Sequence, residues 1–334
     1  MTRAWSWGRP VGGVLILAVL VWRVGAGPFL DGVRSLDAWS LLAATAITAL
    51  TTVASAWRWR AVARGLGIRL PLGTAVGAYY RSQFLNSALP GGVDGDVHRG
   101  VRHGLDAGDL SRGLRAVAWE RTAGQVVFVG LALVALLVLD SPVHGAMTWI
   151  APTAVVVGLC GALVVRALPH RGGSRRARIV RTVRGDVRDA LLDPRAWPVV
   201  VVSSVVVAAG HGTVFLVAAW TTGTDVSLAR LLPLAMLVLL AMAVPLNVGG
   251  WGPREGMAAW AFAAAGLGAS QGVAAATAYG VMGLVATLPG AVVLAVDALR
   301  RRKAPQRADV GVDESIPEPR QATSNPSRTS SPAR

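Results

Sequence analysis

The sequence predicts an all-α polytopic membrane protein, with about six full transmembrane helices and two re-entrant helical hairpins in an inverted-topology repeat. Of 334 residues, 53% are hydrophobic and only 15% are charged, and the mean hydropathy is +0.50. This composition is too apolar for an ordinary soluble domain. The apolar residues form blocks long enough to cross about 30 Å of hydrocarbon as helices. Arginines cluster at the ends of these blocks.

The apolar blocks can be placed in order along the chain. They lack the polar faces at helical period that the helices of a soluble bundle show. The first block follows Arg3 and Arg9, as in a signal peptide. Arg23 interrupts it and no clear cleavage site follows, which favours an uncleaved span. The full spans are predicted at about residues 11–30, 39–57, 116–139, 147–165, 196–220 and 270–297.

Lysine and arginine residues between the spans orient the chain. They precede the first span, follow the second at Arg58, Arg60, Arg64 and Arg69, and are densest over residues 166–195. The positive-inside bias places both termini in the cytoplasm and the protein in the cell (cytoplasmic) membrane. Anionic lipid headgroups explain the formal net charge of +15 at such positions, so no nucleic-acid partner is predicted.

Two further apolar segments are short and interrupted by proline and glycine. Residues 72–98 carry Arg81 and Asn86 and lead back to the cytoplasmic arginines, which predicts one re-entrant hairpin. Residues 228–267 predict a second hairpin that enters from the outside. Both tips run proline, glycine pair, single glycine, charged pair. They read Leu89-Pro90-Gly91-Gly92-Val93-Asp94-Gly95-Asp96-Val97-His98-Arg99 and Val244-Pro245-Leu246-Asn247-Val248-Gly249-Gly250-Trp251-Gly252-Pro253-Arg254-Glu255.

Each half of the chain therefore reads span, span, hairpin, span, and the two halves start from opposite sides. The halves cover residues 1–145 and 146–300, and residues 301–334 predict a disordered basic cytoplasmic tail. Secondary transporters place the substrate site where two such broken segments meet near the bilayer midplane. The alternative is that the proline and glycine clusters only end helices at loops.

Charged residues within or beside apolar spans are costly, so they are expected to face a cavity and to pair. The amides that open the limb at Arg254, together with this arginine, can hold a phosphate, and Arg81 and Arg99 can do so from the first hairpin. Glu120 and Glu255 are expected to neutralise these arginines in the absence of lipid. The predicted substrate-binding residues are Arg81, Asn86, Pro90, Gly91, Gly92, Asp96, Arg99, Glu120, Arg121, Asn247, Gly249, Gly250, Gly252, Arg254 and Glu255.

Several polar residues have alternative interpretations. Asp94, Asp96 and His98 can ligate a metal, but three loop residues without a fourth partner are weak evidence for a metal site. Asp96 is better explained as the cap of the helix that follows. Glu120 and Arg121 can form a structural ion pair. His211 is interpreted as a hydrogen-bonded packing residue, and Tyr79 and Tyr80 as part of an interfacial belt. No nucleotide-binding or hydrolase motif is present, so no cofactor, metal or catalytic residue is predicted.

Over about residues 10–300 the chain resembles the lysylphosphatidylglycerol synthase transmembrane-region family of flippase-like membrane proteins. The resemblance implies a lipid-translocating membrane domain, which some members join to a soluble aminoacyl-lipid synthase. Residues 301–334 leave no room for such a domain, so the resemblance favours translocation over lysyl transfer. It rests on Asn86, Leu89-Pro90-Gly91-Gly92, Gly95-Asp96, Arg99, Glu120-Arg121, Pro245, Gly249-Gly250, Gly252, Arg254 and Glu255.

The leading hypothesis is a flippase-like transporter of a phospholipid, glycolipid or polyprenyl-linked lipid, with an anionic phosphate headgroup as its partner. One alternative is a membrane enzyme acting on a lipid phosphate or lipid-linked sugar through Asp94, Asp96 or Glu120 and a divalent metal. Another is an accessory subunit of a lipid-modifying enzyme. A transporter is favoured over an enzyme. The lipid, direction, energy source and oligomeric state are left open.

Overall fold

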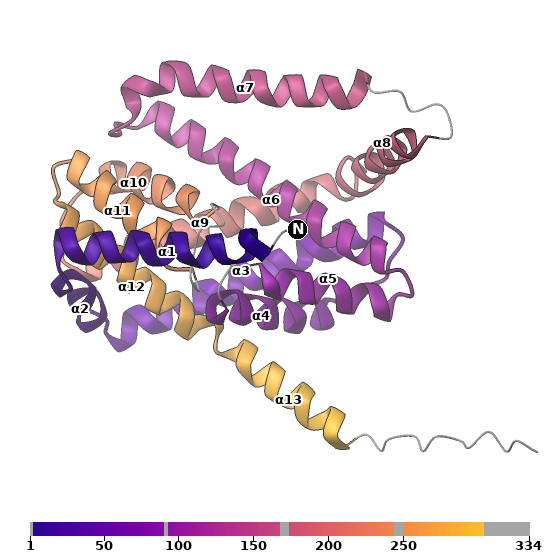
Figure 1. Cartoon of the computed structure of the whole chain (residues 1–334), viewed down its shortest axis with the longest axis horizontal. Coiled ribbons are helices and arrows are strands. Elements are labelled where there is room, and N and C mark those ends of the chain that lie inside the picture. The colour runs from indigo at the N-terminus through magenta and orange to yellow at the C-terminus, as the bar shows by residue number, and fades with distance from the viewer. Residues whose placement is uncertain (1–2, 90–92, 168–173, 244–249, 304–334) are drawn as a thin grey trace, which may run out of the picture. The chain divides into compact units, whose positions relative to one another are not determined.

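Helices make up the architecture of the computed structural model, which describes residues 3–89, 93–167, 174–243 and 250–303 (Figure 1). The described residues up to Val296 belong to one compact unit, which contains all the packing discussed below. In chain order the elements are α1 (Arg3–Val24), α2 (Gly27–Arg34), α3 (Ala38–Gly65), α4 (Leu72–Ala88), α5 (Asp94–Asp106), α6 (Leu110–Val138), α7 (His144–Ala167), α8 (Arg175–Asp186), the π-helical turn η1 (Val187–Leu191), α9 (Trp197–Thr221), α10 (Leu228–Ala241), α11 (Pro253–Ala264), α12 (Ala269–Thr287) and α13 (Pro289–Lys303).

Five of these stretches are long and apolar enough to cross a membrane. They are α3, α6, α7 over His144–Gly161, α9, and a stretch over Ala269–Arg300. The bent pair formed by α1 and α2 is a sixth candidate. The prediction of an all-α polytopic membrane protein is therefore confirmed. The predicted tail is described only as far as Lys303, and its remainder lies outside the described residues.

The predicted first span over residues 11–30 does not form one straight helix. The chain bends by 98° between α1 and α2. Gly25 has a positive φ of 88°, which side chains with a Cβ rarely adopt. Pro28 then lies in the first turn of α2, where its missing amide hydrogen costs nothing. The break follows from this pair of residues, which hydropathy does not register.

The second predicted span also needs correction, because α3 continues past residue 57 to Gly65. The helix begins after Asp37, whose carboxylate accepts a hydrogen bond of 2.8 Å from the amide of Ser40. Arg58 is only 4% exposed inside this helix. It is therefore not part of a loop on the membrane surface, as the count of arginines assumed. For Arg58 the count is wrong, because it gives every arginine the same weight, whether or not a buried partner neutralises it.

The arginine-rich connection over residues 166–195 contains α8 and η1. Ser174 caps α8 by accepting a hydrogen bond from the amide of Ala177. At the other end of α8, the Asp186 carboxylate accepts hydrogen bonds of 2.9 Å from Arg115 Nε and Trp119 Nε1 of α6. These bonds attach the basic connection to a long apolar helix.

Two pairs of short helices lie between the long ones. In the first pair α4 has 17 residues and α5 has 13. In the second pair α10 has 14 residues and α11 has 12. The two helices of each pair pack against each other. Each is shorter than the roughly 20 residues that cross a bilayer. The tips at residues 90–92 and 244–249 lie outside the described residues.

The packing of the second half repeats that of the first. α3 packs on α4 as α9 packs on α10, and α5 packs on α6 as α11 packs on α12. Likewise α3 contacts α6 and α9 contacts α12. The contacts between the halves follow the same pattern. α4 contacts α12, and its counterpart α10 contacts α6. In the same way α3 contacts α12, and its counterpart α9 contacts α6. Exchanging α3–α6 with α9–α12 therefore preserves these helix contacts.

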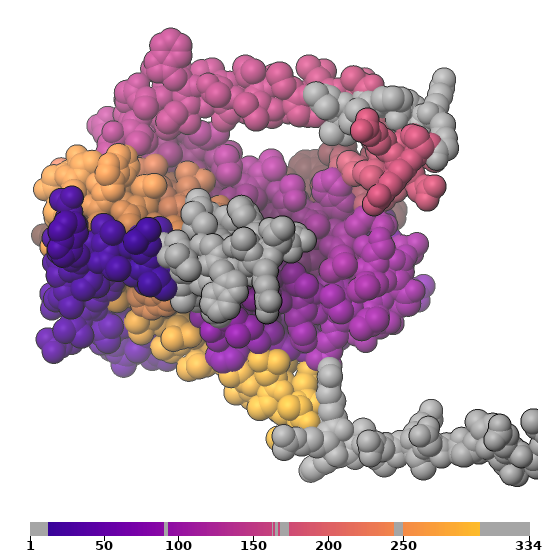
Figure 2. Space-filling model, viewed as in Figure 1, coloured from indigo at the N-terminus to yellow at the C-terminus, as the bar shows by residue number. Residues whose placement is uncertain are grey.

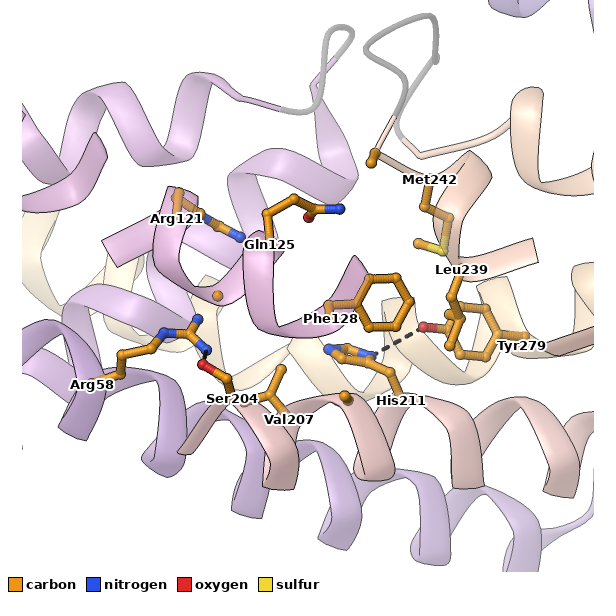
Figure 3. A pocket seen from close by; sticks show the side chains of 13 residues that line it. Arg58, Arg121, Gln125, Phe128, Ser204, Val207, His211, Leu239, Met242 and Tyr279 are labelled. Atoms are coloured by element: carbon orange, nitrogen blue, oxygen red, sulfur yellow. Dashed lines mark hydrogen bonds between the residues drawn. The ribbon is translucent and has the colours of Figure 1, made fainter. Parts of the chain in front are cut away.

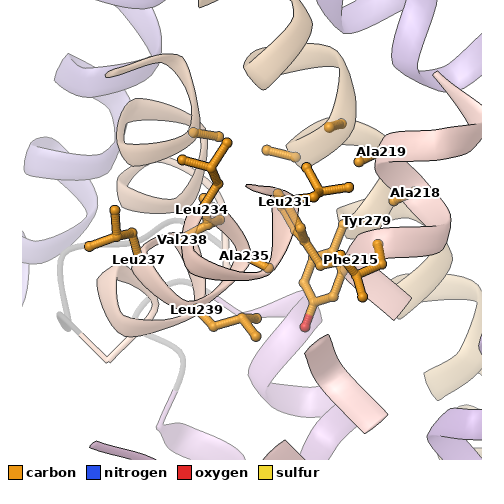
Figure 4. Close-up of a cluster of buried hydrophobic side chains, with 14 of the residues drawn as sticks. Phe215, Ala218, Ala219, Leu231, Leu234, Ala235, Leu237, Val238, Leu239 and Tyr279 are labelled. Carbon is orange, nitrogen blue, oxygen red and sulfur yellow. The ribbon is translucent and has the colours of Figure 1, made fainter. Parts of the chain in front are cut away.

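The largest buried apolar cluster draws most of its residues from α9, α10, α11 and α12, with further members from α3, α6 and α7 (Figure 4). The ring of Phe215 lies 6.4 Å from that of Phe262 and 5.8 Å from that of Tyr279, between centroids. At the crossing of α9 and α3, a Cβ on Gly210 would lie 2.2 Å from Thr51 Cγ2. Such close contacts matter in a membrane because packing, rather than exclusion of water, holds apolar helices together there.

α7 differs from the other long helices in its exposure. In the space-filling view it stands apart from the rest of the molecule over much of its length (Figure 2). Large apolar side chains such as Trp149, Val157 and Leu163 are more than half exposed. An apolar helix that exposes such side chains is suited to contact with lipid.

Candidate functional site

A buried glutamate on α6 connects four helices. Glu120 is fully buried and accepts hydrogen bonds from Arg58 Nε at 2.9 Å and Arg58 Nη2 at 2.6 Å. The hydroxyl of Tyr79 donates to the same carboxylate at 3.0 Å, and Arg99 Nη2 donates to its other oxygen at 3.0 Å. Two arginines from α3 and α5 thus share one buried carboxylate. Removing that carboxylate would leave Arg58 without a carboxylate partner and Arg99 with Asp96 alone.

Arg99 is held by aromatic rings as well as by carboxylates. Its Cζ lies 4.4 Å from the ring centroid of Trp59 and 4.2 Å from that of Tyr79. In the described part of the chain, its Nε and Nη1 have no hydrogen-bond partner. The two rings stabilise the cation where these two nitrogen atoms have no hydrogen-bond acceptor. Tyr79 is only 2% exposed, so its predicted place in an interfacial belt is wrong. The Tyr79 hydroxyl donates a hydrogen bond to Glu120. Hydropathy does not reveal such a role.

Asp96 joins the two helices of the first short pair to α6. Its carboxylate accepts hydrogen bonds from Ser82 Oγ at 3.0 Å, Asn86 Nδ2 at 3.1 Å and Arg99 Nη2 at 3.0 Å. Arg121 Nη2 contacts both oxygens, at 2.7 and 2.6 Å. Asp96 lies in the first turn of α5, so it is not the capping residue that the sequence suggested.

The cap position of α5 is occupied by Val93, whose side chain makes no capping hydrogen bond. The first turn of α5 is instead held by a contact with α4. The Gly95 amide donates to Asn86 Oδ1 at 2.8 Å, and a Cβ on Gly95 would lie 2.1 Å from the Ser82 carbonyl oxygen. Gly95 thus lets α5 approach α4. No group of three metal-ligating side chains is present among the described residues, so the alternative metal site at Asp94, Asp96 and His98 has no geometric support.

A second buried arginine and glutamate lie at the start of α11. Glu255 Oε2 accepts a hydrogen bond of 2.7 Å from the amide of Gly252, and its Oε1 accepts one of 2.8 Å from Arg254 Nε. Arg254 Cζ lies 4.8 Å from the ring centroid of Trp251 and 5.6 Å from that of Tyr279. This arginine therefore also combines a carboxylate with aromatic rings.

Glycines on two long helices make room for the buried guanidinium groups. A Cβ on Gly124 of α6 would lie 2.8 Å from Arg58 Cζ. A Cβ on Gly280 of α12 would lie 2.2 Å from Arg254 Nη2. Each guanidinium group therefore lies directly against a helix backbone, at a place where any other residue would collide with it.

Two adjoining cavities lie between these groups, with volumes of about 250 and 260 Å³. We call them together the chamber. The chamber is bounded by α3, α6, α9 and α12, with contributions from the short pairs, and Figure 3 shows the first cavity. The residues that line both cavities are Arg58, Arg121, Val207, His211, Met242 and Tyr279.

The chamber carries positive charge. Arg58, Arg121 and Arg254 line it, and its described lining residues include no aspartate or glutamate. The Arg121 side chain is 45% exposed. Cations in a partly enclosed space attract anions, and guanidinium groups match the geometry of phosphate and carboxylate oxygens. The chamber is therefore suited to an anionic group.

His211 and Tyr279 form the wall of the chamber opposite Arg121 (Figure 3). His211 Nδ1 lies 3.1 Å from the Tyr279 hydroxyl. The histidine is hydrogen-bonded, as predicted, but it also faces the chamber. On the Arg58 side, Nη1 of that arginine donates to Ser204 Oγ at 3.0 Å. The wall therefore offers neutral polar groups beside the cations.

The structure separates the predicted site residues into three groups and leaves Arg81 apart from them. Lining the chamber are Asn86, Arg121, Gly250 and Arg254. Asp96, Arg99, Glu120, Gly252 and Glu255 do not line it but connect to its arginines through hydrogen bonds. Pro90, Gly91, Gly92, Asn247 and Gly249 lie outside the described residues. Arg81 is buried in α4 and does not line either cavity.

Sequence reasoning missed Arg58 and Tyr279 as site residues. Arg58 carried one available signal, because it stands between Trp57 and Trp59 at the end of an apolar block. That context is unlike an exposed basic loop. Tyr279 stands in an apolar, alanine-rich helix and offers no comparable signal.

Comparison with family models gives one match to nearly the whole apolar part of the chain. The model described as "Lysylphosphatidylglycerol synthase TM region" matches residues 10–290. This range contains α3 to α12 and every residue that lines the chamber. The search of curated proteins finds no match for the chain.

Proposed function

The chain belongs to the lysylphosphatidylglycerol synthase TM region family, and on this premise we propose that it translocates a lipid with an anionic phosphate headgroup across the cytoplasmic membrane. Family membership indicates a membrane protein of lipid metabolism or translocation. The substrate is a phospholipid, a glycolipid or a polyprenyl-linked lipid. A lipid-modifying enzyme that supplies or consumes this lipid is a candidate partner.

The observation that carries the proposal is the charge of the chamber. Three arginines line it, and no carboxylate is found among its described lining residues. Buried cations within a membrane are costly, and they are retained where they meet a ligand or an ion. A phosphate headgroup supplies negative charge and several acceptor oxygens. Arg121 and Arg254 are the proposed phosphate-binding residues, with Arg58 beside them.

In this proposal the two pairs of short helices are re-entrant hairpins. The helix lengths and the repeated packing pattern support an internal repeat. The distribution of arginines supports opposite orientations of the two halves, with both termini cytoplasmic. Transporters with inverted repeats place the substrate between them, near the midplane. The chamber contacts residues of both pairs, as this arrangement requires.

The geometry gives less support to a metal-dependent lipid enzyme. Asp96 and Glu120, its candidate ligands, already accept hydrogen bonds from arginines. A metal ion would have to displace these cations before either carboxylate could bind it.

A vesicle assay tests the proposal. Purified protein is reconstituted into phosphatidylcholine vesicles that contain fluorescent phosphatidylglycerol or a fluorescent polyprenyl phosphate, and a membrane-impermeant quencher reports leaflet exchange. We expect faster exchange of at least one anionic lipid, and a loss of about tenfold or more in Arg121→Gln and Arg254→Gln, because each removes a charge-assisted phosphate contact. Arg112→Gln, on the exposed first turn of α6, is the control. Unchanged exchange of every anionic lipid tested would refute translocation.

A further inference from the structure

Asp96 stands at the edge of the chamber, bonded to one of its lining arginines. Its side chain is 14% exposed, whereas those of Glu120 and Glu255 are fully buried. Asp96 is thus the most accessible of the three carboxylates that neutralise the arginines of this region. It is the one that an incoming anion can most easily replace.

Arg121 is bound to Asp96 by only one of its nitrogen atoms. Within the described part of the chain, Nη2 makes both contacts with the Asp96 oxygens, and no bond involves Nε or Nη1. The side chain is 45% exposed, and it lines the chamber. A phosphate oxygen can therefore reach this guanidinium group while Asp96 is still attached to it.

Asp96 has hydrogen-bond donors besides Arg121. Without that arginine, Oδ1 still accepts hydrogen bonds from Ser82 and Arg99, and Oδ2 still accepts one from Asn86. Each oxygen keeps at least one donor. The free-energy cost of turning Arg121 away from Asp96 is consequently smaller than the cost of leaving a buried carboxylate unpaired.

We propose that Asp96 competes with the phosphate of the substrate for Arg121, and so keeps the affinity of the chamber low enough for the anion to leave. This inference rests on the proposed function. A transport site must bind its ligand well enough to admit it and weakly enough to release it. A carboxylate beside Arg121 reduces the positive potential that the phosphate meets. When the anion departs, Arg121 pairs with Asp96 again.

The arginines elsewhere in the chamber have less freedom to exchange partners. Arg58 shares Glu120 with Arg99 and Tyr79 in a fully buried position. Arg254 is paired with Glu255, which is held in turn by the Gly252 amide. Arg121 is therefore the arginine at which competition has the largest effect.

The test compares binding by the full-length wild type and by Asp96→Asn in neutral detergent. The probes are dihexanoyl phosphatidylglycerol and inorganic phosphate, measured by isothermal titration calorimetry. Asparagine keeps an oxygen that can accept from Arg121 but removes the negative charge. We expect the Kd of at least one probe to fall about tenfold, because one charge close to the phosphate is lost. In the vesicle assay, the same variant should translocate lipid more slowly, because release is delayed.

Asp94→Asn is the matched control. It removes the same charge from the same turn of α5, but Asp94 is exposed and lines neither cavity. Its Kd should equal that of the wild type. In an Arg121→Gln background, Asp96→Asn should no longer tighten binding. Should Asp96→Asn fail to fold, Asp96→Ser removes the same charge and should also lower the Kd.

The outcomes separate this inference from the proposed function. A wild type that binds and translocates lipid, with weaker or unchanged binding in Asp96→Asn, overturns the competition and leaves translocation standing. A wild type that binds neither probe and moves no lipid overturns both. Tighter binding of the lipid probe alone assigns the effect to a headgroup. Tighter binding of both probes assigns it to phosphate in general, and either result supports the competition.

Discussion

Glu120 and Glu255 are both fully buried, but the arginines that they neutralise come from different parts of the chain. Glu120 on α6 accepts from Arg58 on α3 and Arg99 on α5. Glu255 accepts from its neighbour Arg254 and from the amide of Gly252 at the start of the same helix. The first cluster is therefore a tertiary contact among several helices, and the second is a local contact that shapes one helix end.

This difference in connectivity predicts a difference in stability. Loss of a shared tertiary carboxylate should loosen the packing of several helices at once. Loss of a local carboxylate should affect mainly the start of α11. The following variants test the comparison, in order of decreasing expected effect.

Glu120→Gln should destabilise the protein most. Without the carboxylate Arg58 loses its carboxylate partner and Arg99 keeps only Asp96, and breaking a buried ion pair in this way costs about 3–5 kcal/mol. The loss can be measured as a lower SDS fraction at half-unfolding, followed by tryptophan fluorescence. Asp94→Asn, at an exposed carboxylate, is the control for removal of charge. A Glu120→Gln variant as stable as this control would contradict the assignment of a tertiary role.

Glu255→Gln should destabilise the protein less, by about 2 kcal/mol, because only one arginine loses its ionic partner. The glutamine oxygen can still accept the hydrogen bond from the Gly252 amide. The same SDS titration measures the difference between the two variants. An effect equal to or larger than that of Glu120→Gln would show that the local cluster is the more important one.

Gly280→Ala should cost roughly 1–3 kcal/mol, because the new Cβ would collide with the Arg254 guanidinium group and force it to move. Gly283→Ala is the matched control on the same helix, since no atom lies within 4 Å of its added Cβ. Thermal unfolding in detergent is a suitable measurement. Equal melting temperatures for the two variants would mean that Arg254 has room to move away without cost.

Tyr279→Phe should have the smallest effect, about 1 kcal/mol, because it removes a single hydrogen bond to His211. Its ring remains available to pack on Phe215 and beside Arg254. A double-mutant cycle with His211→Ala isolates the bond, since Tyr279→Phe should cost nothing further in that background. Strict additivity of the two substitutions would exclude a direct contribution from this hydrogen bond.

The residues that make the site differ in how far their roles could be predicted. Glu120, Arg121, Arg254 and Glu255 stand out in the sequence because charge beside apolar segments is costly and demands a partner. Glu120 and Glu255 were expected to neutralise arginines of the site, but the sequence did not indicate which arginine pairs with which carboxylate, except for the neighbours Arg254 and Glu255. Arg58 and Glu120 are far apart in the sequence, and only the packing of α3 against α6 brings them together.

Helix boundaries show the same division. The predicted fifth span, 196–220, agrees closely with α9, because an uninterrupted apolar run has clear ends. The first and second spans were placed less well. One is bent at Gly25, and the other continues through Arg58. Hydropathy measures average transfer energy, so it does not record a positive φ or a charge neutralised by a distant residue.

The sequence by itself determined that this protein is a helical membrane protein, which residues are too polar for their surroundings, and which family the chain resembles. These properties follow from composition, from the length of apolar runs and from short local motifs. The tertiary structure decided which arginine meets which carboxylate, and which arginines face the chamber rather than the space between aromatic rings. These pairings depend on contacts between helices that are distant in the chain, because the same packing that brings the helices together also brings each buried charge to its partner.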